Sequence, residues 1–359
     1  MWTARHCNGM KPIAMKVLVT GATGFVGRWV TRALREAGSD VVAFARRFPS
    51  GSPSRVAGVT QVRGDVLSSS DVAAAMSDVD AVIHCAGSVS LKQRDSEALE
   101  LANVVGTTNV LTAAAARSIR VIHTSTTASI GPTREPRNLD EAAPAATLDF
   151  ECAYVTSKRR AEAIALSYAR DGLDIVVLNP GVVLGPGDFG ATSTQIVLGY
   201  LTGQLRFHLR GGASFCDVRD VANAYVSALE RGRKGERYLL AGNNRSHAEL
   251  QAELQLLTGL APSLPLPQPT ADLLARWSSA TARLFRHPLE DFNPAVVGWG
   301  SLFNYCDSSK AERELGYRAR PLTHTLIDTI TSHLQRGAAA ARTDKLRQLL
   351  QAAEPSEVT

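Results

Sequence analysis

Short apolar runs alternate with amphipathic stretches along the first half of the chain. The runs have the length and the β-branched composition of buried strands, and they predict strands at residues 16–19, 41–45, 59–62, 81–84, 121–124 and 175–178. Helical spacing lies between them, at residues 25–37, 71–77, 97–117 and 153–170. This alternation predicts an α/β fold with a doubly wound parallel sheet, whose strands are joined by helices.

The pattern becomes irregular after Pro180. Glycine and proline clusters, such as Gly185-Pro186-Gly187 and the run 262–269, separate shorter helical stretches. We expect this half to form a smaller, mostly helical C-terminal cap that binds substrate, because loops beside a rigid sheet commonly carry such contacts. The strand character of residues 237–241 predicts a return to the sheet. The expected organisation is a sheet domain over 15–185 and about 216–241, a cap over 186–215 and 242–336, and a tail over 337–359.

Charge and cysteine usage narrow the classes of function. The net charge of +5 comes from arginines spread along the chain without a basic block, so no nucleic-acid surface is predicted. The five cysteines include no Cys-x-x-Cys pair, which predicts neither a disulfide framework nor a metal site and favours the cytoplasm. No apolar stretch is long enough to span a membrane, and residues 1–14 are expected to form a disordered leader.

Three glycines follow the first predicted strand at Gly21, Gly24 and Gly27. In a strand–turn–helix unit, such glycines permit a tight turn, a close approach of backbone N–H groups to a pyrophosphate, and close packing of helix against strand. The N-terminus of the following helix also favours an anion. The unit therefore predicts dinucleotide binding in a Rossmann domain.

Tyr154 and Lys158 lie four residues apart at the head of a predicted helix, so their side chains share one face. A neighbouring ammonium stabilises a phenolate, and we expect Lys158 to lower the pKa of Tyr154 from its ordinary value near ~10. The pair then serves as a proton donor to a carbonyl that is being reduced.

The glycine spacing together with Tyr-x-x-x-Lys resembles the extended branch of the short-chain dehydrogenases/reductases, the NAD-dependent epimerase/dehydratase superfamily. The overall likeness is greatest to its dihydroflavonol 4-reductase and 3β-hydroxysteroid dehydrogenase-like group. The resemblance covers most of residues 16–335. It implies that one hydroxyl in the run Thr124-Ser125-Thr126-Thr127 is catalytic. The family's catalytic residue is commonly the third of such a run, which here is Thr126, and Ser125 is the alternative.

Further motifs match the same family. They are Gly64-Asp65-Val66, His84-Cys85-Ala86-Gly87, Asn103 on a helix, and the loop 179–187, while residues 215–222 resemble the signature of the substrate domain. The residues expected to hold the cofactor are Gly21, Thr23, Gly24, Phe25, Val26, Gly27, Arg46, Arg47, Asp65, Val66, Cys85, Ala86, Gly87, Asn103, Thr124, Tyr154, Lys158, Pro180, Gly181 and Val183.

The end of the second strand predicts the cofactor. NAD-selective Rossmann domains place a carboxylate there to bind the ribose 2′-hydroxyl, whereas this strand ends in Ala45 and continues with Arg46 and Arg47. Guanidinium groups suit a 2′-phosphate. NADP(H) is therefore favoured, with NAD(H) as the alternative.

Three functions are compatible with these residues. The first is NAD(P)H-dependent reduction of a ketone on a bulky, apolar or secondary-metabolite-like substrate, through Thr126, Tyr154 and Lys158. The second is epimerisation of a nucleotide sugar, and the third is a non-catalytic NADP-binding redox sensor. Sugar dehydratases of this superfamily carry an Asp-Glu pair directly after the catalytic threonine. This chain has Thr127-Ala128 at that place, so the pair is absent. A sensor has no need of a complete Thr/Tyr/Lys set. The partner is a small molecule, and a homodimer is an open possibility.

Overall fold

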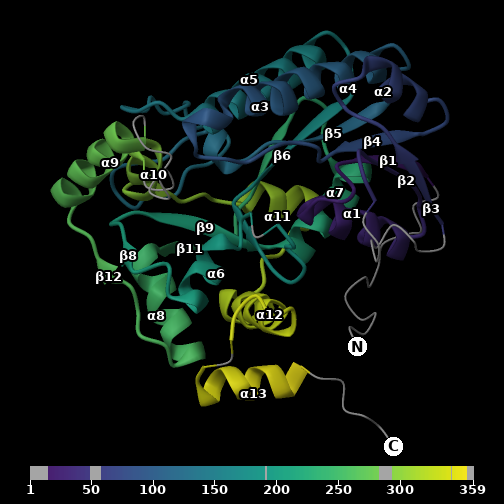
Figure 1. The fold of residues 1–359 in the computed structure, drawn as a ribbon. Helices are drawn as coiled ribbons and strands as arrows, with labels where there is room; N and C mark the ends of the chain where they lie inside the picture. Colours follow the sequence, from purple (N-terminus) through teal and green to yellow (C-terminus); the bar gives the residue numbers. More distant parts are fainter. Residues whose placement is uncertain (1–14, 49–57, 191, 283–292, 341, 354–359) are drawn as a thin grey trace, which may run out of the picture.

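Seven parallel strands form the central sheet of the protein in a computed structural model (Figure 1). The structure describes residues 15–48, 58–190, 192–282, 293–340 and 342–353, so the expected leader lies outside it. The order is β10-β6-β5-β4-β1-β2-β3. The bounds are β1 Lys16–Thr20, β2 Asp40–Ala45, β3 Val59–Arg63, β4 Ala81–His84, β5 Arg120–Thr124, β6 Ile175–Pro180 and β10 Arg237–Leu240. The doubly wound parallel sheet is confirmed, including its return strand.

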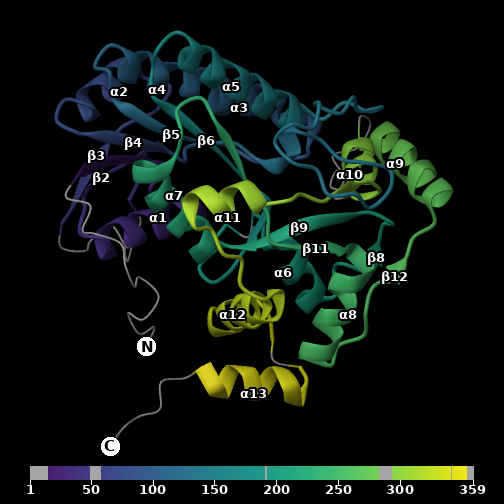
Figure 2. The ribbon, with the colours of Figure 1, turned by 180° about the vertical axis from the view of Figure 1, so that it is seen from behind.

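Helices cover both faces of this sheet, which is why strands such as β1 are apolar on both sides (Figures 1 and 2). The helices on one face are α1 Phe25–Glu36, α7 Val218–Arg231 and α11 Ser309–Leu315. The helices on the other face are α2 Ser69–Ala75, α4 Gly106–Ala115 and α5 Ala153–Arg170, with α3 Ser96–Glu100 beside α5. The single helix expected over 97–117 is divided, because a π-helical segment at Leu101–Val105 joins α3 to α4.

Apart from α7, β10 and α11, the second half of the chain forms the cap below the sheet (Figure 1). Its helices are α6 Gln195–Thr202, α8 His247–Thr258, α9 Gln268–Ala282, α10 Pro294–Gly300, α12 Leu322–Gln335 and α13 Asp344–Ala353. A small sheet accompanies them, in which β9 Gly212–Asp217 pairs with β7 Val182–Leu184, β11 Asn243–Ser246 and β13 Phe303–Asn304. A further strand pair consists of β8 Phe207–His208 and β12 Leu264–Pro265.

Two late segments lie in places that the sequence pattern did not indicate. Ala311, Leu315 and Tyr317, which the sequence places in the cap region, pack into the core beside the central sheet. Within the expected tail, α13 packs against α8 and α12 and buries Leu346 completely. None of the helices described is long and apolar enough to cross a membrane.

Candidate active site

The glycine turn after β1 has the geometry that its spacing predicts. Gly21 has a φ of +66°, and a Cβ on it would lie 2.7 Å from the backbone nitrogen of Ala86. A Cβ on Gly27 would lie 2.2 Å from the carbonyl oxygen of Gly21. Only glycine fits at these two positions. Gly24 caps α1 without a side-chain hydrogen bond, so the N–H groups of the first turn remain available to an anion.

A series of side-chain hydrogen bonds holds the loop after β4 beside this turn. The Thr20 hydroxyl contacts His84 Nδ1 at 2.7 Å and accepts a hydrogen bond from the Ala86 N–H at 3.2 Å. Asn103, in the π-helical segment, accepts from the Ser88 N–H at 2.8 Å and donates to the Ser157 hydroxyl at 3.0 Å. The glycine turn, this loop and α5 are thereby fixed relative to one another. π-helical turns of this kind are often found at functional sites.

Tyr154 and Thr126 form a hydrogen bond at the carboxyl end of β5, and Lys158 reaches the last residue of the same strand. Burial raises the pKa of Tyr154, and a hydrogen bond with the Thr126 hydroxyl opposes the rise. Lys158 donates to the carbonyl oxygen of Thr124 at 2.7 Å, and burial lowers its pKa to about 8. The pKa of Tyr154 therefore departs upward, opposite to the expected direction, because desolvation outweighs the hydrogen bond to its hydroxyl.

Ser125 points to a different group, the buried carboxylate of Glu162. The hydroxyls of Ser125 and Ser129 donate to Glu162 Oε2, and the Asn179 amide donates to the same oxygen at 2.7 Å. Arg237 binds the other oxygen at 3.1 Å. Glu162 also opposes the loss of charge on Lys158, one turn earlier on α5. Sequence reasoning did not identify Glu162, for which the available signal was its position four residues after Lys158.

Arginine side chains lie at the ends of β2 and β3. Arg46 and Arg47 are exposed directly after β2, and Arg63 donates to the carbonyl oxygen of Arg46 at 3.2 Å. Arg63 is a further cation near this edge that the sequence analysis did not single out. Asp65, one of the residues expected to hold the cofactor, accepts from the Leu67 N–H at 3.0 Å and so closes the turn after β3.

The remaining predicted residues lie along the same edge of the sheet. Thr124 donates to the Cys85 sulfur at 3.5 Å and accepts from the Tyr225 hydroxyl at 2.9 Å. Gly181 follows Pro180 at the end of β6, and a Cβ on it would lie 2.3 Å from the carbonyl oxygen of Ser214. Val183 in β7 is buried in the core. The strand order therefore brings together the segments after β1, β4, β5 and β6, and it leaves Arg46 and Asp65 at the side.

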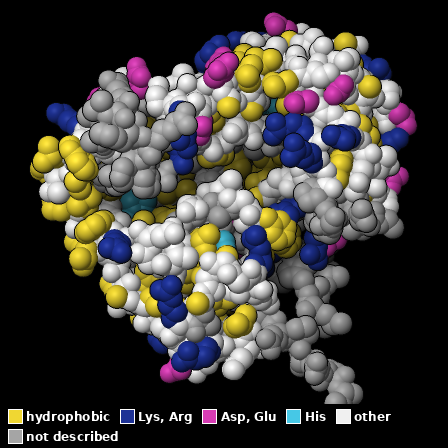
Figure 3. All heavy atoms as spheres, viewed as in Figure 1, with side chains coloured by type: hydrophobic (Ala, Val, Ile, Leu, Met, Phe, Trp, Pro, Cys, Tyr) yellow, Lys and Arg dark blue, Asp and Glu magenta, His cyan; other side chains and the backbone are white. Residues whose placement is uncertain are grey.

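Tyr154 packs against a buried apolar cluster to which side chains from three further segments also contribute. They include Leu91 from the loop after β4, Leu148 and Phe150 from the loop before α5, and Trp299 from α10. The Asn293 amide, at the start of α10, donates to the Leu91 carbonyl at 2.9 Å and joins two of these segments. Figure 3 shows a hollow between the two halves of the molecule with hydrophobic side chains on its walls.

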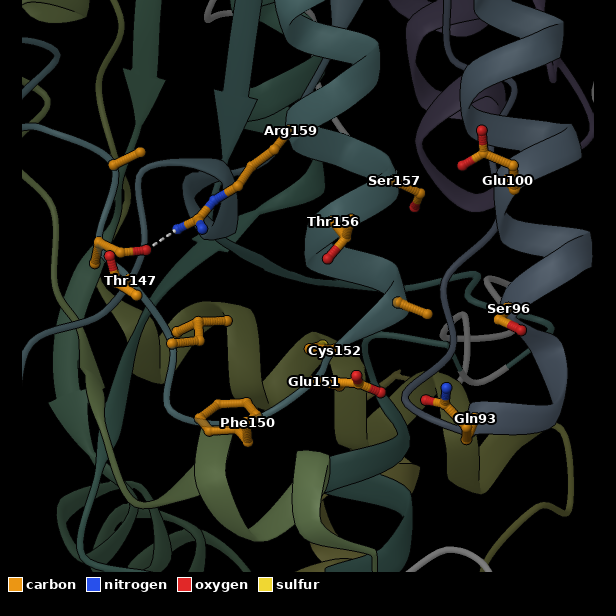
Figure 4. A pocket seen from close by; sticks show the side chains of 14 residues that line it. Gln93, Ser96, Glu100, Thr147, Phe150, Glu151, Cys152, Thr156, Ser157 and Arg159 are labelled. Carbon is orange, nitrogen blue, oxygen red and sulfur yellow. Dashed lines mark hydrogen bonds between the residues drawn. The ribbon is translucent and has the colours of Figure 1, made fainter.

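A separate pocket of about 580 Å³ lies on the outer side of α5 (Figure 4). Its lining includes Leu148, Phe150 and Thr156 but neither Tyr154 nor Lys158, so it opens on another side of α5. Arg159 crosses its wall and donates to the Ala146 carbonyl at 2.7 Å.

Comparisons with known proteins agree with this geometry. The model of the NAD dependent epimerase/dehydratase family matches residues 17–241. A Synechocystis protein that bears the name "putative dihydroflavonol 4-reductase" is 34% identical to this chain. The match covers 87% of this chain and 92% of that protein. A ketoreductase of Stigmatella aurantiaca that acts on a farnesyl-substituted dihydroquinoline oxide is 30% identical, over 86% of this chain and 93% of its own.

Solved structures show the same fold. That of a nucleoside-diphosphate-sugar epimerase from Pseudomonas aeruginosa superposes with a TM-score of 0.74 at 26% identity, covering 90% of this chain and 99% of that one. The family match covers the glycine turn, Tyr154 and Lys158, and the curated relatives described above are reductases. This chain therefore belongs to the NAD-dependent epimerase/dehydratase family, the extended short-chain dehydrogenases/reductases, and is an oxidoreductase of that family.

Proposed function

We propose that the protein is an NADPH-dependent carbonyl reductase that converts a ketone on a bulky, apolar substrate to an alcohol. The observation that carries the proposal is the hydrogen bond between Thr126 and Tyr154 at the end of β5, with Lys158 bonded to Thr124 of the same strand and an apolar cluster beside Tyr154. The sensor alternative leaves this set without a purpose. Epimerisation has no specific observation in its favour, and Arg46 and Arg47 stand where an NAD-binding carboxylate is usual.

The described residues fit a nicotinamide dinucleotide. Cβ atoms on Gly21 and Gly27 would collide with backbone, and the uncapped start of α1 suits a pyrophosphate. The guanidinium of Arg46, with Arg63 beside it, suits the 2′-phosphate of NADP. Lys158 and Tyr154 would face the nicotinamide ribose, and Gly181 would lie beside the nicotinamide. When bound, the cofactor supplies the hydride.

The roles of the chain's own residues follow from their pKa shifts and contacts. Burial raises the pKa of Tyr154, so its phenol carries a proton when a substrate binds, and we assign it as the proton donor to the oxygen of a reduced carbonyl. The Thr126 hydroxyl, which contacts Tyr154, would share in holding that oxygen. Lys158 is fixed by the Thr124 carbonyl and supplies positive charge when the tyrosine gives up its proton. Overall, a ketone, NADPH and one proton would be converted to an alcohol and NADP⁺.

The apolar wall supports the class of substrate. Leu91 and Trp299 pack in the same apolar cluster as Tyr154, and such surfaces favour rings and alkyl chains over the hydroxyls of a sugar. Relatives support the same choice, since their names describe reduction of a farnesyl-substituted ring ketone and of 2-alkyl-3-oxoalkanoates.

The test uses NADPH deuterated at C4 with a panel of apolar ring ketones. We expect deuterium at the carbinol carbon and one NADPH consumed per alcohol formed. Tyr154→Phe should lose most of its turnover with little change in NADPH binding, because only the proton donor is removed. Tyr168→Phe, on the same helix with a hydroxyl that contacts Thr112, is the matched control and should keep its activity. Conversion without net loss of NADPH, or full activity in Tyr154→Phe, would refute the proposal.

A further inference from the structure

Helix α9 carries its larger apolar side chains on the face turned away from the core. Its buried face consists of Ala271, Ala275 and Ser278, whereas Leu273 is 69% exposed and Trp277 is 58% exposed. A helix at the surface of a globular protein normally has the opposite arrangement, with large apolar residues inside and polar ones outside. The sequence of α9 therefore places hydrophobic surface in contact with the surroundings.

A neighbouring strand pair extends this surface. Phe207 of β8 and Leu264 of β12 are partners in register, and both are exposed. Leu266, which follows β12, packs against the buried face of α9, so the strand pair and the helix are continuous. We call the α9 patch the five exposed side chains Phe207, Leu264, Leu273, Leu274 and Trp277. Hydrophobic side chains gather at this edge of the molecule in Figure 3. A contiguous exposed patch of this kind marks an interaction site.

The charged residues beside the α9 patch are mainly basic. Arg206 and Arg276 are exposed and adjoin Phe207 and Trp277 in the sequence. Asp272 is the one acidic residue of α9, and its carboxylate accepts a hydrogen bond from Gln268 at 2.9 Å. Arg210, also near β8, is paired with Glu135. The chain as a whole has a net charge of +5. Apolar side chains that include an exposed tryptophan, with basic residues at their margin, match the interface of a bilayer with anionic headgroups.

One helix, α10, lies between α9 and the apolar cluster of the candidate active site. Val297 of α10 packs against the buried face of α9, while Ala295 and Trp299 of the same short helix pack in the cluster around Tyr154. The short helix α10 therefore contacts both α9 and the apolar cluster that includes Tyr154.

We propose that the α9 patch docks the protein reversibly onto the surface of a bilayer that contains anionic lipids. Trp277 and Leu273 enter the interface, Arg206 and Arg276 contact headgroups, and α10 then faces substrates dissolved in the membrane. Only this last step rests on the proposed reductase function, since docking can be measured without turnover.

The experiment is co-sedimentation of the full chain with vesicles of phosphatidylcholine alone or mixed equally with phosphatidylglycerol. We expect binding to the mixed vesicles that weakens with salt. Each of Arg206→Gln and Arg276→Gln should weaken it about fivefold, since a basic residue at an anionic surface contributes about 1 kcal/mol. Trp277→Glu and Leu273→Glu should abolish it. The matched control is Leu256→Glu, because Leu256 on α8 is 71% exposed outside the patch and its replacement should bind like wild type.

A second readout uses the fluorescence of Trp277. Vesicles should shift the emission of the wild type to shorter wavelength, and Trp277→Phe should lose the shift. Sedimentation that is equal with and without phosphatidylglycerol, or unchanged in Trp277→Glu, would overturn the proposal. A dimer in light scattering that Leu273→Glu dissociates, without vesicle binding by the wild type, would identify the α9 patch as a contact between copies of the chain instead. If the wild type binds vesicles but reduces no ketone, the proposed function is rejected and the docking proposal stands.

Discussion

Replacing Glu162 by glutamine is predicted to destabilise the protein although the two side chains have the same shape. Oε2 of Glu162 accepts hydrogen bonds from Ser125, Ser129 and Asn179, and Oε1 accepts one from Arg237. Glutamine has one oxygen and one NH₂ group. If its oxygen faces Asn179, its NH₂ faces the Arg237 guanidinium, and in the flipped orientation its NH₂ faces the Asn179 amide. Either way, two donors meet and a buried hydrogen bond is lost.

The size of the effect follows from the burial of these groups. A buried donor left unpaired costs about 1–3 kcal/mol. Removing one partner of a buried ion pair costs about 3–5 kcal/mol. The Arg237 side chain is 27% exposed, so water replaces part of the lost interaction. We therefore expect a loss near the lower end, about 3 kcal/mol in the free energy of unfolding.

The assay is urea unfolding followed by circular dichroism, with the slope against urea compared between variants. Glu36→Gln is the matched control, because Glu36 forms an exposed pair with Arg32 and should lose less than about 1 kcal/mol. A second readout is the pH profile of turnover. Without the Glu162 charge, the pKa of Lys158 should fall further, and the alkaline loss of activity should begin at lower pH. A destabilisation no larger than that of Glu36→Gln, together with an unchanged profile, would refute the reasoning.

Three further predictions concern the candidate active site. Activity that depends on the Lys158 ammonium should be present below a pH of about 8 and lost as pH rises through that value, which the pH dependence of kcat/KM measures. Thr126→Ala should lower kcat by roughly 10²–10³, as removal of one donor to a developing oxyanion does, whereas Ser125→Ala should mainly lower the unfolding temperature because its hydroxyl serves Glu162. Equal kcat values for these two variants would contradict the assignment. Arg46→Ala should weaken NADPH binding by about 1.5–3 kcal/mol in fluorescence titration and leave NADH binding unchanged, and equal affinities of the wild type for both cofactors would reject the role of Arg46.

The central sheet could be predicted from sequence because its strands are buried on both sides. Runs such as Val17-Leu18-Val19 are then apolar at every position, and the glycine turn that follows is local in sequence. The small sheet in the cap was not visible in this way. Strand β7 has only the three residues Val182–Leu184, too few to show a period, and its pairing with β9 depends on contacts far along the chain.

The polar groups around Tyr154 could be predicted only in part for the same reason. Lys158 has a fixed spacing from Tyr154, so one helix places both. The hydrogen-bond partners of Glu162 are separated from it by between 17 and 75 positions in the sequence. A single sequence gives no signal for such pairing. The direction of the pKa shift of Tyr154 likewise depends on how much apolar side-chain volume surrounds the hydroxyl, which only the folded chain determines.

The late return of the chain to the central sheet has a consequence for biosynthesis. A ribosome releases β6 long before β10, which pairs with its edge, and still longer before α11 and Tyr317 cover the adjoining core. At a synthesis rate of ~5–20 residues per second, the edge of β6 stays unpaired for roughly 3–12 seconds, and the core that Tyr317 covers stays exposed for roughly 7–27 seconds. During that time the strand edge can pair with other nascent chains. A fragment that stops at the end of the family-model match, near residue 241, would have all seven strands and still leave hydrophobic surface uncovered.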